Sequence, residues 1–133
     1  GTVFLAKYNT GGFHQWSGGF ASTSQFTSIA ADFAGNTFLV GRCSGTADFG
    51  GGVLSCGAGA SADLVVSKFD SAGQTLWSRA YGGANLQTLT AAAVMPITGD
   101  VIVAGFNAGT LDLGGGPLIS AGNYDALVAR LAP

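Results

Sequence analysis

Short apolar stretches, separated by turns rich in Gly, Asp and Asn, run along the whole chain. The stretches are nearly continuously apolar, a pattern typical of strands covered on both faces. Two of them open on Gly35-Asn36 and Gly99-Asp100, which indicate tight hairpins. We predict strands at residues 2–8, 27–33, 36–42, 63–70, 75–81, 88–95, 100–106 and 125–131. The prediction is an all-β fold, with no helix longer than one turn.

The strand pattern repeats. "FLAKYNTGGFHQWS" from Phe4 matches "VVSKFDSAGQTLWS" from Val65, and the match places Trp16 over Trp77. "GNTFLVGRCSGTADFGGG" matches "GDVIVAGFNAGTLDLGGG", and "DALVARL" begins a third, partial copy. Each unit of about sixty residues holds four strands in an up-and-down meander. We divide the chain into a partial unit 1–26, a full unit 27–87 and a partial unit 88–133.

The phrases "GTADFGGG", "GNTFLVG" and "DLVVSKFDSAGQTLWSRAYGG" carry a family resemblance. The chain resembles the bacterial β-propeller repeat of secreted and surface proteins, often called the seven-bladed propeller repeat. That resemblance implies four-stranded antiparallel blades, one for each unit. It implies little about activity, because one fold hosts many functions.

Slightly more than two blades cannot close a propeller ring. The chain opens on the third strand of a blade and has no signal peptide, which favours a processed or trimmed product. We therefore expect either a fragment of a longer propeller or a subunit that assembles with copies of itself. The expected partners are the chain itself, as a homo-oligomer or filament, or the missing blades of a longer chain.

The two glycine-rich phrases connect the second and third strands of their blades. Asp48 and Asp112 are expected to be structural turn residues that accept hydrogen bonds from the backbone N–H groups after them. The glycines after each Asp supply backbone conformations that a Cβ forbids. Phe49 and Leu113 are expected to anchor each loop on its own blade.

Cys43 and Cys56 are the only cysteines, and both are replaced in the second unit, by Asn107 and Ser120. Their joint replacement favours a disulfide that closes the glycine-rich loop, and two buried free thiols are the alternative. Two cysteines and one distant histidine do not make a tetrahedral metal site. No two Asp residues are closer in sequence than Asp63 and Asp70, so no calcium loop is expected. We predict no metal and no cofactor.

Charged residues make up only 9% of the chain, and the net charge is −2. The chain has no basic cluster, which argues against nucleic acid as a partner. No apolar run approaches the length of a membrane span. A surface this poor in charge is common in secreted proteins, so we expect an extracellular or cell-surface location.

No catalytic set is apparent, so we predict that the chain is not an enzyme. His14 is interpreted as an exposed edge residue, since no nucleophile or orienting acid lies near it in the sequence. Trp16 and Trp77 are assigned to packing between blades, with sugar stacking as the alternative. The expected function is a noncatalytic scaffold or assembly module. The alternative is a carbohydrate-binding propeller, whose glycan-facing loops would present Gln25, Asn85 and Gln87.

Overall fold

The computed structural model describes residues 1–59 and 61–133. Thirteen β-strands and one 3-10 helix, η1 (Gly59–Ser61), make up its regular structure, and every strand pair is antiparallel. The prediction of an all-β fold is therefore confirmed. Within the described residues, no helix is long and apolar enough to span a membrane.

Three sheets hold the longer strands, and we call them sheets 1, 2 and 3. Sheet 1 pairs β1 (Thr2–Tyr8) with β2 (His14–Ala21). Sheet 2 has the order β3-β4-β7-β8, with bounds Gln25–Ala31, Thr37–Cys43, Asp63–Phe69 and Thr75–Tyr81. Sheet 3 has the order β9-β10-β13, with bounds Gln87–Val94, Val101–Asn107 and Asp125–Leu131. Sheet 2 is thus a complete four-stranded meander.

Each glycine-rich connection contains a small hairpin of its own. Between β4 and β7 this hairpin pairs β5 (Thr46–Asp48) with β6 (Val53–Ser55), and it forms a two-stranded sheet of its own. Between β10 and β13 the equivalent hairpin pairs β11 (Thr110–Asp112) with β12 (Pro117–Ile119). The sequence predicted only loops at these two places.

The first strands of sheets 2 and 3, β3 and β9, each carry a β-bulge opposite a glycine of the neighbouring strand, β4 or β10. The pairing register of β3 and β4 shifts between Phe26 and Ser28, beside Gly41. A Cβ on Gly41 would lie 2.1 Å from the carbonyl oxygen of Gln25, and one on Gly105 would lie 2.0 Å from that of Thr88. These contacts are too close for any side chain, so the bulge explains why glycine occupies both repeat-equivalent positions.

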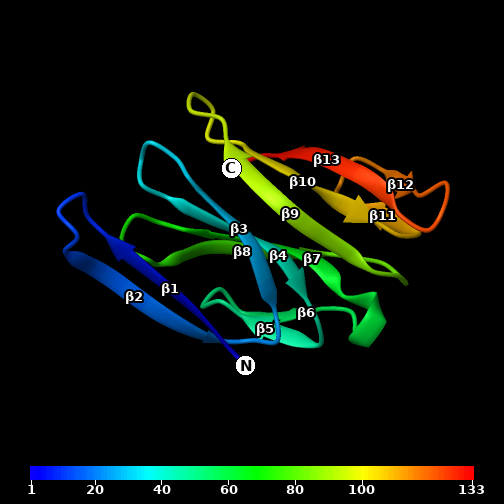
Figure 1. Ribbon diagram of the computed structural model, residues 1–133, viewed down its shortest axis with the longest axis horizontal. Coiled ribbons are helices and arrows are strands. Elements are labelled where there is room, and N and C mark those ends of the chain that lie inside the picture. Colours follow the sequence, from blue (N-terminus) through cyan, green and yellow to red (C-terminus); the bar gives the residue numbers. More distant parts are fainter.

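The three sheets stack face to face, with sheet 2 in the middle (Figure 1). Alternate residues of β4 point to opposite sides, because successive side chains of a strand do so. Leu39 joins the cluster against sheet 1, whereas Phe38 and Val40 join the cluster against sheet 3. The first cluster contains Leu5, Leu39, Cys43, Ala47, Phe49, Val65 and Phe69. The second contains Phe38, Val40, Leu64, Val66, Leu89, Val101, Val103, Leu111, Leu127 and Leu131. Sheet 2 is therefore buried on both faces, which explains its nearly continuous apolar strands.

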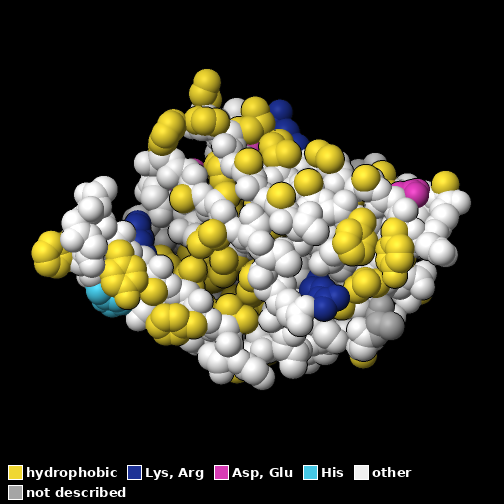
Figure 2. Space-filling model, viewed as in Figure 1, with side chains coloured by type: hydrophobic (Ala, Val, Ile, Leu, Met, Phe, Trp, Pro, Cys, Tyr) yellow, Lys and Arg dark blue, Asp and Glu magenta, His cyan; other side chains and the backbone are white. Residues whose placement is uncertain are grey.

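The outer faces of sheets 1 and 3 remain open to solvent. Phe4 and Tyr8 of β1 are 71% and 59% exposed, although Val65 and Phe69 at the equivalent positions of β7 are fully buried. Figure 2 shows hydrophobic side chains gathered beside the single histidine, at the sheet 1 end of the molecule. At the other end, Val128 of β13 is 73% exposed. The stack thus ends in apolar surface on both sides.

Candidate functional site

The glycine-rich hairpins have the same turn geometry in both units. The carboxylate of Asp48 accepts hydrogen bonds from the backbone N–H groups of Gly50 at 2.8 Å and Gly52 at 3.3 Å. The carboxylate of Asp112 accepts from Gly114 at 2.7 Å and Gly116 at 3.1 Å. All four glycines have positive φ, between 91° and 107°, a conformation that glycine adopts at the least cost. The two Asp side chains therefore shape the turns, as the sequence indicated.

Phe49 follows Asp48 and lies between two sheets rather than on its own sheet alone. Its ring is fully buried and makes edge contacts with Phe20 of β2 at 5.9 Å and Phe26 of β3 at 5.3 Å. Leu113, in the second unit, likewise packs against the cluster between sheets 2 and 3. The sequence-based expectation of anchoring within one sheet was therefore incomplete, because each hairpin also helps to join neighbouring sheets.

The base of the β5–β6 hairpin is closed by a disulfide between Cys43 and Cys56, whose Cα atoms are 5.8 Å apart. Next to it, the N–H of Gly45 donates to the carbonyl of Gly57 at 2.8 Å. In the second unit, hydrogen bonds replace the covalent bridge. The Asn107 amide donates to the carbonyl of Gly109 at 3.3 Å, and the Ser120 hydroxyl accepts from the Gly109 N–H at 2.7 Å. The predicted disulfide between Cys43 and Cys56 is present. In the second unit, Asn107 and Ser120 close the base of the equivalent hairpin with hydrogen bonds instead.

Trp16 packs between sheets, as the sequence favoured. Its indole N–H donates to the carbonyl of Ser71 at 2.9 Å, in the turn that precedes β8. The ammonium group of Lys7 donates to the same carbonyl at 3.1 Å. The turn carbonyl therefore holds sheet 1 against sheet 2 through two donors.

Trp77 occupies the equivalent position in sheet 2. Its ring meets Phe38 edge-on at 6.2 Å, and the Arg79 guanidinium lies over it at 4.6 Å. The Trp77 indole N–H is buried and, among the described residues, has no hydrogen-bond partner. Trp77 thus packs beside the cluster between sheets 2 and 3, and among the described residues it lacks the hydrogen bond that Trp16 makes.

A concave site at the loop end of sheet 3 is lined largely by hydrophobic side chains. The pocket measures about 510 Å³, and its principal side chains are Leu86, Phe106, Tyr124 and Asp125. The rings of Phe106 and Tyr124 meet edge-on at 5.4 Å. An adjoining pocket of about 370 Å³ shares Leu86 and Tyr124 and adds the amides of Asn85 and Asn123. Together they form an aromatic wall bordered by hydrogen-bonding groups.

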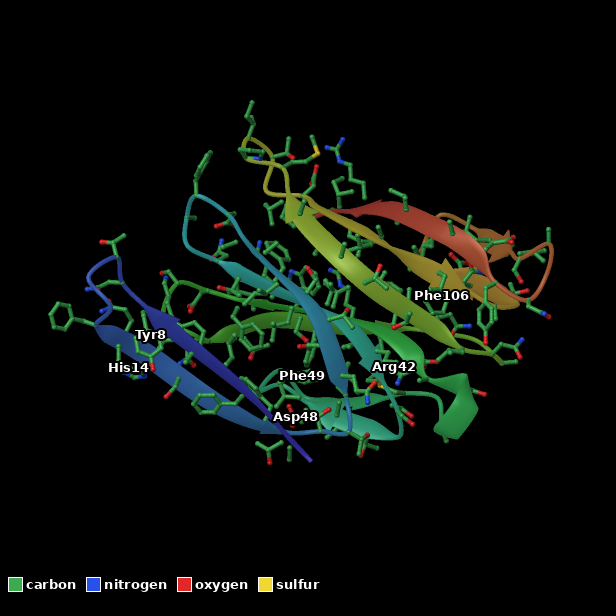
Figure 3. The ribbon with its side chains drawn as sticks, in the orientation of Figure 1. Tyr8, His14, Arg42, Asp48, Phe49 and Phe106 are labelled. Atoms are coloured by element: carbon green, nitrogen blue, oxygen red, sulfur yellow. A yellow bond between two sulfur atoms is a disulfide. The ribbon has the colours of Figure 1, made fainter. Side chains whose placement is uncertain are left out.

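The equivalent place in sheet 2 is smaller and polar. This pocket of about 160 Å³ includes Gln25, Arg42 and Ala62 in its lining. Arg42 is the repeat equivalent of Phe106, and both lie in the right half of Figure 3. The Arg42 guanidinium donates to the Gln25 amide oxygen at 2.8 Å. The same position in the repeat therefore carries a cationic lining in one unit and an aromatic lining in the next.

The structure separates the three residues predicted to face a ligand. Gln25 borders the polar pocket and Asn85 borders the aromatic one. Gln87 is fully buried, and its amide donates to the carbonyl of Ala108 at 3.2 Å. Sequence reasoning missed Phe106 and Tyr124. Their signal was the change from Arg42 and Ala62 to two aromatic residues between otherwise matching units.

His14 is exposed and meets the ring of Tyr8 edge-on at 5.6 Å (Figure 3). In the part of the chain that the structure describes, no carboxylate hydrogen-bonds to it, and no group of three or more His, Cys, Asp or Glu side chains could hold a metal ion. Neither the protein-family models nor the curated proteins compared with this chain gave a match.

Proposed function

We propose that this chain is a noncatalytic β-propeller repeat module, extracellular or on the cell surface, that serves as a structural or assembly scaffold. In this proposal, sheet 2 is one full blade of the unit 27–87. Sheet 1 supplies the third and fourth strands of the preceding blade, and sheet 3 supplies the first three strands of the next. The propeller repeat suggested by the glycine-rich motifs accounts for this order of strands.

One observation carries the proposal: repeat-equivalent positions are buried inside the stack and exposed at its ends. Val66 of β7 is fully buried between sheets, whereas its equivalent Val128 is 73% exposed. Apolar sheet faces of this kind favour association with another sheet. The chain therefore presents a surface at each end that fits a further repeat.

The disulfide between Cys43 and Cys56 supports an oxidising location, because disulfides persist mainly in secreted and surface proteins. Sedimentation velocity over a series of concentrations tests the assembly proposal. We expect species larger than the 13.2 kDa monomer at micromolar concentration. A single monomeric species at every concentration would contradict the proposal.

The aromatic pocket favours carbohydrate binding as a second candidate function. Sugars bind through stacking of their apolar faces on aromatic rings and hydrogen bonds to amides and carboxylates, and the pocket brings Phe106 and Tyr124 close to Asn85 and Asn123. A glycan array with the native chain tests this function. Tyr124→Ala should abolish any glycan signal. Phe33→Ala, which removes an aromatic ring that is 89% exposed elsewhere, should leave the signal unchanged.

A further inference from the structure

Strand β1 has an open edge where its repeat equivalent in sheet 2 has a partner. In sheet 2, the third strand β7 pairs with β4 on one edge and with β8 on the other. Among the described residues, β1 pairs with β2 alone, and its other edge lies toward β3 (Figure 1). An unpaired strand edge is a template on which another strand can pair.

A hollow of about 310 Å³ lies along this open edge. Its apolar lining comes from three strands: Phe4 and Leu5 of β1, Phe26 and Ile29 of β3, and Leu39 of β4. Ile29 lies directly opposite Leu39, so both side chains point to the side of sheet 1. Ile29 is nevertheless 57% exposed, whereas its equivalent Ala92 packs against the cluster between sheets 2 and 3. The hollow is thus an uncovered part of a surface that is covered in the next sheet.

The contact between sheets 2 and 3 shows what covers such a surface. Strands β3 and β4, the first and second strands of sheet 2, lie over β9 of sheet 3. The Thr27 hydroxyl donates to the Leu89 carbonyl, and the Ser28 hydroxyl accepts from the N–H of Ala92 at 3.1 Å. Leu89 is fully buried there. The occupant that fits the hollow beside β1 is therefore a pair of first and second strands.

The pair β9–β10 supplies the first and second strands of sheet 3, and no sheet of the described chain covers its outer face. On that face Ile102 is half-buried, whereas its equivalent Phe38 is fully buried. Thr90, the equivalent of Thr27, is exposed. Each of these two hydroxyls also donates to a carbonyl of its own second strand at 3.3 Å. The pair β9–β10 therefore carries the groups that β3–β4 uses to cover a neighbouring sheet.

We propose that the β9–β10 pair of one copy fills the hollow beside β1 of a second copy. β10 then pairs with the open edge of β1, and the four strands β9, β10, β1 and β2 form one sheet between the two copies of sheet 2. The Thr90 hydroxyl donates to the Phe26 carbonyl of the second copy, as Thr27 donates to Leu89 within one chain. The proposal rests on the assembly function proposed above and names the surfaces that join.

Strand β13 occupies this edge of β10 in the single chain, so it leaves when β1 of the second copy arrives. Both strands have seven residues and are equivalent in the repeat, so one ladder replaces another of the same length. Phe4 and Tyr8 take the places of Leu127 and Leu131 against sheet 2 of the first copy. They are 71% and 59% exposed in the single chain, so the exchange buries two aromatic side chains, which favours it.

The turn between β1 and β2 also fits this arrangement. Residues 132–133 leave together with β13, so the turn meets no chain at the place that they occupied. The contact joins two different surfaces, head to tail, and each added copy offers a further hollow and a further β9–β10 pair. The assembly therefore grows one copy at a time.

The first test locks β13 to β10 and measures self-association of the full chain by sedimentation velocity. Ala104 of β10 lies opposite Val128 of β13 and opposite Ala91 of β9. Ala104→Cys with Val128→Cys bridges β10 to the strand that must leave, and this chain should be monomeric. Ala104→Cys with Ala91→Cys is the matched control, because it bridges two strands that move together, and it should associate as the native chain does. Non-reducing peptide mapping verifies both bridges, and native-like association of the locked chain would overturn the inference.

A charge in the hollow provides an independent test. Ile29→Arg places a guanidinium where the strands of the second copy would pack, and association should weaken by at least about tenfold. Ile97→Arg makes the same change at a residue that is 98% exposed in the turn before β10, and it should leave association unchanged. Urea unfolding checks that both variants fold. Equal association of the two variants would contradict the proposed contact.

Mixing two of these chains gives the sharpest result. The locked chain keeps its hollow, and the Ile29→Arg chain keeps a β13 that can leave, so a one-to-one mixture should form a dimer that stops growing. Each sample is refolded from urea at the test concentration, so that strand exchange reaches equilibrium. Absence of this dimer would overturn the inference, and the assembly function would stand if the native chain still associates. A native chain that stays monomeric at every concentration would refute both.

Discussion

The hairpins β5–β6 and β11–β12 have the same shape but are closed at the base by different chemistry. The first is closed by the Cys43–Cys56 disulfide, and the second by hydrogen bonds from Asn107 and to Ser120. At the tips, Asp48 and Asp112 make matching pairs of hydrogen bonds to glycine N–H groups. The tip chemistry is therefore shared and sets the conformation, whereas the closure at the base varies and mainly affects stability.

The largest effect is expected from giving the first hairpin the closure of the second. The double variant Cys43→Asn and Cys56→Ser removes a bond that closes a loop of 13 residues, worth about 3 kcal/mol in the chain-entropy model. New hydrogen bonds should restore about 1 kcal/mol of this loss. Urea unfolding should therefore show a net loss of about 2 kcal/mol. A loss equal to that of Cys43→Ala with Cys56→Ala would mean that the hydrogen bonds do not transfer.

The reverse exchange, Asn107→Cys with Ser120→Cys, should form a second disulfide, because the equivalent base of the first hairpin already holds one. The expected gain in the free energy of unfolding is about 1–2 kcal/mol, less than the native disulfide provides, because engineered bridges fit less well and two hydrogen bonds are lost. Non-reducing peptide mapping detects the bridge, and urea unfolding measures the gain. Two free thiols after oxidation would show that the two hairpin bases are not equivalent.

Removing the carboxylate at the tip distinguishes the two hairpins more finely. Asp48→Ala and Asp112→Ala each remove two hydrogen bonds to exposed N–H groups, at a cost of about 1 kcal/mol. The loosening should be smaller for Asp48, because the disulfide still holds the base of its hairpin. Hydrogen exchange at Gly50 and Gly114 compares them, and equal protection in both variants would contradict the role assigned to the disulfide.

The smallest effect concerns pH. A hydrogen bond from Thr98, and then one from Arg130, lower the pKa of Asp100 below its ordinary value. Burial raises the pKa of Asp32, but hydrogen bonds from Asn36 outweigh it and the net pKa is lowered. A carboxyl whose folded pKa is depressed stabilises the protein above its unfolded pKa, and this stabilisation is lost as the pH falls through the folded pKa. Stability should therefore decline below about pH 4, and Asp100→Asn should flatten the decline in urea titrations.

The repeat in the sequence predicted most of the long strands, because each unit constrains the interpretation of the other. It did not predict β5, β6, β11 and β12, since strands of three residues carry too little pattern to distinguish them from loops. The disulfide was predictable because Asn107 and Ser120 showed that both cysteines change together. The burial of Gln87 was not, because its amide donates to the carbonyl of Ala108, which follows the paired strand β10 and lies 21 residues further along the chain. The aromatic pocket joins residues from three separate segments, which no local pattern connects.

The disulfide also changes how the chain would extend under force. A stretched polypeptide lengthens by at most about 3.5 Å for each residue. Because Cys43 and Cys56 are linked across 13 positions, the hairpin between them lies outside the path that carries tension from one end of the chain to the other. The oxidised chain therefore reaches a full extension roughly 40 Å shorter than the reduced chain. Once the surrounding sheets had been pulled apart, the first hairpin would therefore stay closed at its base, whereas the second, held by hydrogen bonds, would extend with the rest of the chain.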